Sequence, residues 1–173
     1  MLACRPGEVM STRRRSYESG HKPKFLVVID DTPECDRALY FASRRALRIG
    51  ATVVMLRVIE TQDRNQQWLG VADIMRAEAH DEANTALDRH AARSSSITGA
   101  QPERVIREGA LAEELLKLID EDEDIAALIL AAGTSNEGPG PLVSSLAKSA
   151  GTFPVPIAVV PGQLSDEDLD SMT

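Results

Sequence analysis

The sequence predicts an α/β protein, a single doubly wound domain in which a five-stranded parallel sheet carries helices on both faces. Two observations lead to this prediction. Five short apolar runs alternate along the chain with four segments whose apolar residues recur at helical spacing. Strands that alternate with helices form parallel sheets through right-handed crossovers, which place helices on both faces. With 173 residues, 43% of them hydrophobic, the chain is sufficient for one such core.

The first half of the chain supplies two strands and two helices. The run KFLVVID at 24–30 has the composition of a buried parallel strand and ends in a carboxylate. A Thr-Pro pair follows it and favours a helix start, so a helix is expected over 33–49, with Gly after its last residue. The run ATVVMLRVI predicts a second strand at 51–59. An amphipathic helix is then expected over 71–93.

The second half supplies three strands and two shorter helices. PERVIR at 102–107 predicts a short third strand, and leucines at helical spacing predict a helix over 111–121. The apolar run IAALILAA at 125–132 predicts the fourth strand. A helix is expected over 143–150, and PIAVV at 156–160 completes the sheet.

Two flanking segments are expected to lie outside the domain, which spans residues 24–162. Residues 1–23 are rich in Arg, Ser, Glu and Gly without periodicity, which is typical of a flexible tail. Met10 precedes a plausible polar start, so residues 1–9 are expected to be an upstream extension of the reading frame, with Met1 and Met10 as alternative starts. Residues 163–173 carry four carboxylates and are expected to form a solvated acidic tail.

The charge distribution argues against nucleic acid and membranes as partners. The net charge is −8, but residues 1–24 hold six basic residues and two glutamates, a net +4, so the rest carries −12. Phosphate backbones and anionic membranes attract basic surfaces. No stretch reaches the roughly 18 apolar residues of a membrane span, and no signal peptide is recognisable. Cys4 and Cys35 are expected to be unpaired, which favours the reducing cytoplasm.

The stretch after the fourth expected strand has the pattern of an anion-binding loop. It leads from the strand end through three glycines to two serines at a helix start: Ala132, Gly133, Gly138, Gly140, Ser144 and Ser145. The first N–H groups of a helix lack partners within it, and the helix dipole favours negative charge there. Ligands of doubly wound sheets bind beyond the carboxyl ends of the strands, where the strand order reverses. Asp30, at the end of the first strand, is expected to face this loop across a crevice.

Taken together, these segments resemble the universal stress protein family, part of the adenine-nucleotide alpha-hydrolase-like group. The resemblance covers residues 24–162 and rests on order and spacing. Its motifs are VVIDDTPECDRAL, GATVVMLRVI, EGALAEELLKLI before IAALILAAG, and PIAVV. It implies the strand order 3-2-1-4-5 and homodimers that pair through the fifth strand. Some members bind ATP, while others do not.

The nucleotide-binding members carry G-x2-G-x9-G-[ST] after strand four, which this chain matches only in part. Gly133 and Ser144 match the first glycine and the final serine, whereas Asn136 and Val143 replace the two other glycines. Asn tolerates the left-handed conformation, and Gly138 could replace the second glycine, as could Gly140, with a different loop path. A β-branched residue resists positive φ and adds bulk where a phosphate would pass.

The resemblance also implies that Asp30 contacts the base or sugar and that Val58 borders the adenine. The chain is then a stress-response protein that binds or senses ATP through an altered loop, with slow hydrolysis at most. The alternative is a dimeric interaction module of the same fold without nucleotide. The loop has no Lys or Arg, so a triphosphate would need Mg²⁺ or backbone groups to balance its charge. No nucleophile, base and orienting group can be assembled, and no catalytic residue is predicted.

Three other candidates leave alternatives open. Asp30 and Asp31 form either a water-mediated Mg²⁺ site or an Asx turn before the helix. Cys35, in the first turn of a helix, has either a lowered thiol pKa or a packing role. His80 and His90 lie about 15 Å apart on one helix, too far for one metal ion, and are expected to be solvated.

Overall fold

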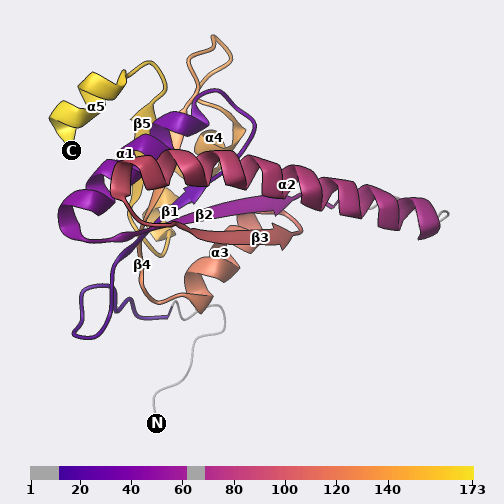
Figure 1. Ribbon diagram of the computed structural model, residues 1–173, viewed down its shortest axis with the longest axis horizontal. Coiled ribbons are helices and arrows are strands. Elements are labelled where there is room, and N and C mark those ends of the chain that lie inside the picture. The colour runs from indigo at the N-terminus through magenta and orange to yellow at the C-terminus, as the bar shows by residue number, and fades with distance from the viewer. Residues whose placement is uncertain (1–11, 62–68) are drawn as a thin grey trace.

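The chain folds into five strands that alternate with helices, as the sequence predicts (Figure 1). The computed structural model describes residues 12–61 and 69–173. The strands are β1 (Lys24–Val28), β2 (Thr52–Ile59), β3 (Glu103–Glu108), β4 (Ile125–Ala132) and β5 (Ile157–Pro161). The helices are α1 (Cys35–Ile49), α2 (Leu69–Thr98), α3 (Leu111–Glu121), α4 (Pro141–Ser149) and α5 (Asp166–Met172), with a 3-10 turn at Ala150–Thr152. The expected extension 1–9 and Cys4 lie outside the described residues.

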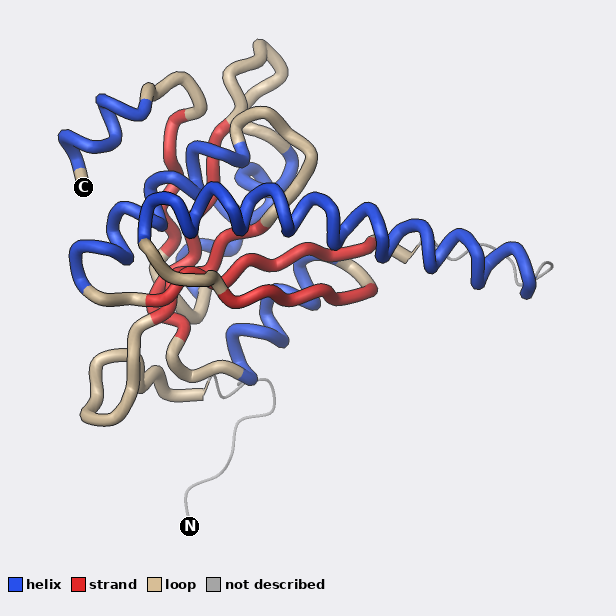
Figure 2. The backbone as a smooth tube through the Cα atoms, viewed as in Figure 1, coloured by secondary structure: helices blue, strands red, loops and turns tan. Residues whose placement is uncertain are grey.

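All described strand pairs are parallel, and the sheet has the predicted order β3-β2-β1-β4-β5. Strand residues alternate between its two faces. Val27 and Met55 pack on one face with Leu39 of α1 and Leu87 of α2. On the other face, the core is formed with α3 and α4 by Leu26, Leu56, Leu115, Ile119, Leu128 and Leu146. Figure 2 shows the red strands between these two layers of blue helices.

Helix α2 is longer than the expected 71–93 at both ends. Its C-terminal extension contains serines and a threonine, which are poor helix formers unless their hydroxyls find partners. Ser94 is buried with its hydroxyl 2.9 Å from that of Ser43 on α1, and Thr98 donates to the Ser94 carbonyl oxygen at 3.0 Å. The N-terminal part of α2 projects beyond the sheet (Figure 2). None of the described helices, α2 included, combines the length and apolarity needed to cross a membrane.

The two edges of the sheet differ in character. The β3 edge is charged, and its side chains form ion pairs with neighbouring elements. Arg104 pairs with Asp88, and Glu103 lies 3.0 Å from the Lys24 ammonium. Strand β5, at the opposite edge, reads IAVVP without any charge, and its Val159 side chain is 45% exposed.

Residues 12–23 are held against the body, whereas a flexible tail was expected. The Thr12 hydroxyl donates to Asp120 at 2.7 Å, and the Arg15 backbone N–H donates to the Glu123 carbonyl oxygen at 2.9 Å. The Arg14 guanidinium donates to the carbonyl oxygens of Ile119 and Asp122. These carbonyls lie at the C-terminus of α3, where a helix has acceptors without partners of its own.

The acidic C-terminal segment forms helix α5, which corrects the expectation of a solvated tail. Ser165 and Asp168 form a capping box: the Ser165 hydroxyl accepts from the Asp168 N–H at 3.1 Å, and the Asp168 carboxylate accepts from the Ser165 N–H at 2.9 Å. Leu169 is buried in the same cluster as α1. The Tyr40 hydroxyl donates to Asp170 at 2.7 Å. Some carboxylates of α5, such as that of Asp170, therefore hold the helix against α1, while others, such as that of Glu167, are exposed to solvent.

Asp166 ties α5 to two other helices. Its carboxylate lies 2.7 Å from the Arg37 guanidinium on α1 and 3.0 Å from that of Arg93 on α2. Burial alone would raise the pKa of Asp166, but the hydrogen bonds from Arg93 and Arg37 outweigh it and leave the pKa lowered. The Arg93 guanidinium also lies 4.9 Å from the centre of the Tyr40 ring.

Replacing Leu169 with alanine tests the docking of α5. Leu169 is 1% exposed, so Leu169→Ala is expected to lower the free energy of unfolding by about 2–4 kcal/mol, measured by urea denaturation. The control is Met172→Ala on the same helix, whose side chain is 59% exposed and whose loss should cost within about 0.5 kcal/mol. Equal stability of the two variants would contradict a docked α5.

Candidate functional site

A pocket of about 440 Å³ opens at the carboxyl ends of β1 and β4. These neighbouring strands mark the point where the strand order reverses, the usual ligand site of such sheets. The walls are apolar and come from β1, β4, α1, α3 and α4: Val28, Cys35, Ala38, Leu111, Leu130, Ala131, Leu142 and Val143. A flat apolar group of the size of a purine base is the kind of ligand that such walls can take.

The structure brings some predicted site residues into the pocket and leaves others out. Asp30, Gly140 and Ser145 line it. Val58 lines an adjoining hollow, which shares Val28, Asp30, Glu60 and Leu111 with the pocket. The remaining predicted residues line neither of these two spaces: Ala132, Gly133, Gly138 and Ser144.

The glycine loop is closed by its own hydrogen bonds. The Gly133 N–H donates to the Pro139 carbonyl oxygen at 3.0 Å, and the Gly138 N–H donates to that of Ser135 at 3.2 Å. Gly138 and Gly140 have φ of 103° and 100°, so they provide the positive φ that the turn requires. No described residue other than glycine has positive φ, so Asn136 does not replace the missing glycine of the pattern. The loop takes a different path, and two of its N–H groups are already used.

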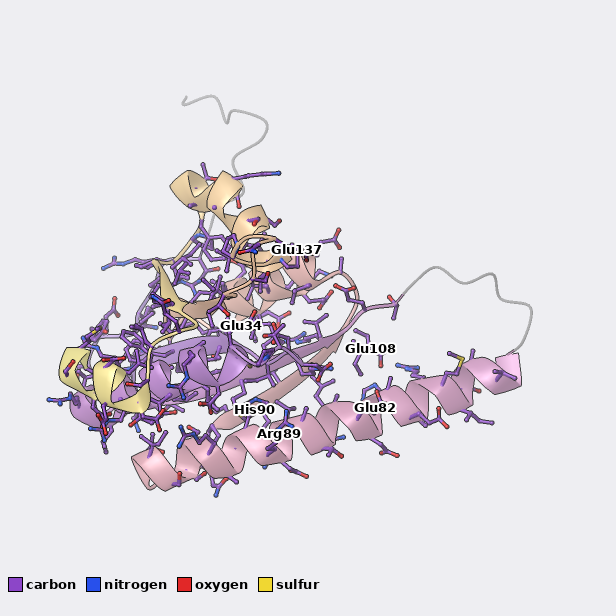
Figure 3. The ribbon with its side chains drawn as sticks, turned by 90° about the horizontal axis from the view of Figure 1, so that it is seen from above. Glu34, Glu82, Arg89, His90, Glu108 and Glu137 are labelled. Carbon is purple, nitrogen blue, oxygen red and sulfur yellow. The ribbon has the colours of Figure 1, made fainter. Side chains whose placement is uncertain are left out.

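Glu34 fills the space that the first glycine of the loop leaves. It precedes α1 and is half-buried. A Cβ built on Gly133 would lie 2.9 Å from the Glu34 Oε1 atom, and one built on Gly162 would lie 3.1 Å from the Glu34 Cβ. Figure 3 labels Glu34, and also Glu137 on the loop itself. The sequence did not point to Glu34, because nearly one hundred residues separate it from the loop.

The described lining includes three carboxylate side chains: Asp30, Glu34 and Glu60. No Lys, Arg or His occurs among its described lining residues. Two like charges 4 Å apart repel by about 1 kcal/mol in water and about 4 kcal/mol at an effective dielectric constant of 20. The lining therefore carries negative charge without a basic side chain to balance it, and an anionic group placed beside it would be repelled.

Asp30 and Asp31 are engaged separately. The Asp30 Oδ1 atom accepts from the Thr32 N–H at 3.0 Å and from its hydroxyl at 2.5 Å, which is the Asx-turn alternative. Asp31 pairs with Arg57 at 2.7 Å, and this hydrogen bond lowers the pKa of Asp31. Among the described residues, no group of three or more His, Cys, Asp or Glu could hold a metal ion.

Cys35 has the packing role. Its side chain is buried, and its thiol lies 3.6 Å from the Val28 carbonyl oxygen, to which it can donate. Burial raises the pKa of the Cys35 thiol to about 12. The N-terminal turn of α1 therefore does not make this cysteine a reactive thiolate.

The expectation of solvated histidines is wrong for His90 and holds in part for His80, whose side chain is 37% exposed. His90 is buried, with Nδ1 2.7 Å from the Ala86 carbonyl oxygen. His80 Nε2 lies 2.5 Å from the Glu108 carboxylate of β3, which Arg76 also contacts. These hydrogen bonds, that from His80 first, lower the pKa of Glu108. Both histidines face neighbouring elements because α2 lies along the sheet.

Three comparisons relate this architecture to known proteins. The sequence pattern of the universal stress protein family matches residues 23–161. A comparison with curated protein sequences finds no match. Among solved structures, universal stress protein UspA from Lactobacillus plantarum is similar, with a TM-score of 0.68 and 16% identity over 80% of this chain and 97% of that chain.

Two similar structures contain an adenine nucleotide. One is a universal stress protein in complex with cAMP, with a TM-score of 0.58 and 18% identity over 80% of this chain and 96% of that one. The other is the universal stress protein from Archaeoglobus fulgidus in complex with dAMP, with a TM-score of 0.54 and 18% identity over the same shares. At these identities, the likeness shows a shared fold.

The raised pKa of Cys35 predicts slow alkylation. In a Cys4→Ser protein, Cys35 is the only thiol, and its thiolate fraction at pH 8 should be on the order of 10⁻⁴. Reaction with iodoacetamide is expected to be at least about a hundredfold slower in the native protein than in 8 M urea. Similar rates in the two conditions would show that the thiol is accessible and ionised.

Proposed function

The chain belongs to the universal stress protein family, and from this premise we propose that it is a stress-response protein that binds the adenosine part of an adenine nucleotide. The observation that carries the proposal is the apolar pocket at the reversal of strand order, with the Asp30 carboxylate among its lining groups. Two structures of the same fold, described as complexes with cAMP and dAMP, support the choice of adenine. Both ligands are monophosphates.

The side chains of the pocket have distinct roles in this proposal. The apolar walls, such as Leu130 and Val143, pack against the base. Thr32 engages only the Oδ1 atom of Asp30, so Oδ2 can accept from a ribose hydroxyl or an amino group. Val58, in the adjoining hollow, extends the apolar surface past the edge of the pocket. The proposed role is binding or sensing, and no catalytic residue is assigned.

ATP is the less suitable nucleotide for the pocket as folded. Three carboxylates line it, and the N–H groups of Gly133 and Gly138 are bound within the loop. When bound with ATP, Mg²⁺ would supply the positive charge that these lining groups lack. The loop's own hydrogen bonds also favour a second candidate function, an interaction module without nucleotide.

Both functions are proposed for a homodimer in the cytoplasm. Universal stress proteins are commonly dimeric. Strand β5 lies at an edge of the sheet, carries no charge and exposes Val159, which suits pairing with the same strand of a second copy. A two-fold axis would then bring the two β5 strands together.

Ligand-dependent melting tests the nucleotide function. Adenosine, cAMP and Mg·ATP are titrated separately, and a ligand at 100 times its dissociation constant adds about 2.7 kcal/mol to the free energy of unfolding. Adenosine and cAMP are expected to raise Tm by several degrees, and Asp30→Ala should abolish this rise. The control is Asp88→Ala, which removes an exposed carboxylate outside the pocket. If none of the three ligands raises Tm at millimolar concentration, the interaction module is the remaining function.

The dimer has its own test. Val159→Lys is expected to convert a dimer into a monomer at micromolar concentration, measured by light scattering, because it places a charge on the edge strand. The matched control is Leu116→Lys, since Leu116 is 44% exposed and belongs to helix α3 instead of an edge strand. A wild-type protein that is monomeric at this concentration would contradict pairing through β5.

A further inference from the structure

We propose that Glu34 determines the charge of the ligand that this pocket accepts, so that uncharged or weakly charged adenine ligands bind in preference to polyphosphates. The inference rests on the proposed adenosine-binding function and adds a selectivity to it. Its basis is the position of the Glu34 carboxylate, the absence of compensating cations among the described lining residues, and the closed loop.

Glu34 occupies the place where a phosphate would approach the backbone. Glycine in a phosphate loop lets anionic oxygens come close to the main chain. Here the atom that comes close to Gly133 is Oε1 of Glu34, since a Cβ on Gly133 would lie only 2.9 Å from it. The stem of Glu34 packs near Gly162, where an added Cβ would lie 3.1 Å from it and 2.4 Å from the Ala132 carbonyl oxygen. Gly133 thus leaves room for a carboxylate of the protein itself, while Gly162 lies against the Ala132 backbone and the stem of Glu34.

The charge of Glu34 has no protein partner among the described residues. Its carboxylate forms neither an ion pair nor a hydrogen bond with them, unlike Asp30 with Thr32 and Asp31 with Arg57. The pocket lining contains no basic side chain, and Lys148 lies in the last turn of α4, away from the lining. An incoming phosphate would therefore meet an uncompensated negative charge.

The other two carboxylates of the lining are less suited to this role. Asp30 already accepts two hydrogen bonds from Thr32, which offset part of its charge. Glu60 is exposed, so water screens it. Glu34 is half-buried and lies directly at the loop, where an interaction between charges is screened least.

Adenosine and ATP make different demands on this arrangement. Adenosine needs the apolar walls and an acceptor, and both are present without any change in the loop. The phosphates of ATP need donors, but the N–H groups of Gly133 and Gly138 are bound to carbonyl oxygens of the loop. ATP must also displace the Glu34 side chain or tolerate its charge. The closed loop and the Glu34 carboxylate both disfavour ATP relative to adenosine. Of the two, only the carboxylate can be changed without altering the backbone.

The experiment compares adenosine, AMP and ATP by calorimetry, in EDTA to remove divalent cations. The proteins are wild type, Glu34→Gln and Glu137→Gln. Glu34→Gln keeps the size of the side chain and removes its charge. Glu137→Gln removes the same charge from an exposed position on the loop that does not line the pocket, and is the matched control (Figure 3).

Wild type is expected to bind adenosine at least about tenfold more tightly than ATP, with AMP between them. Glu34→Gln should raise ATP affinity by about tenfold and leave adenosine affinity within about twofold. Glu137→Gln should leave the adenosine-to-ATP ratio within about twofold of wild type. If Glu34→Gln does not fold, Glu34→Ala, which removes the whole carboxylate, should change the ratio in the same direction.

Three results would overturn the inference, and they separate it from the function on which it rests. Adenosine binding with the same adenosine-to-ATP ratio in wild type and Glu34→Gln overturns the role of Glu34 alone. An equal change in Glu137→Gln shows an effect of net charge and overturns it as well. Failure of every protein to bind any of the three ligands overturns the proposed nucleotide function together with the inference.

Discussion

The central position of β1 is the constraint on which the rest of the structure depends. It lies between β2 and β4 and is parallel to both. Strands β2 and β3 follow β1 on one side of it, and the chain then returns across the sheet to add β4 and β5 on the other side of β1. Because each crossover is right-handed, α1 and α2 cover one face while α3 and α4 cover the other. The loops after β1 and β4 diverge as a result, and the pocket opens between them.

Elements whose formation depends on the burial of one short segment can be predicted from the sequence. Strand β4 has the predicted bounds Ile125–Ala132 because a run without polar residues must be buried on both faces. The contacts that hold residues 12–23 against the domain cannot be predicted from the sequence, because they join distant residues. Arg14, for example, donates to the carbonyl oxygen of Ile119, 105 positions away. The capping box at Ser165 is a local signal and could have shown α5. Glu34 could not be found in this way, since only the folded chain brings it to Gly133.

The glycine loop shows that one composition can serve two purposes. Glycines after a parallel strand are typical of phosphate binding, and Asp30 and Gly140 line the same pocket. Yet Gly138 and Gly140 are needed for positive φ in the turn, and Gly133 makes room for a side chain. The number of glycines in a loop therefore says less about its ligand than the partners of their N–H groups. The fold follows from the sequence pattern, whereas the hydrogen bonds of the loop are known only from the folded chain.

The unequal edges of the sheet limit how copies of the chain can assemble. A sheet with two receptive edges can add copies without end, as in fibrils. Here the side chains of β3 are engaged in ion pairs such as Arg104–Asp88, whereas β5, the other edge strand of the described sheet, carries no charged residue. A pair joined through β5 uses both uncharged edges and leaves two charged ones outward. Association through strand edges then closes at two copies and cannot propagate into a filament.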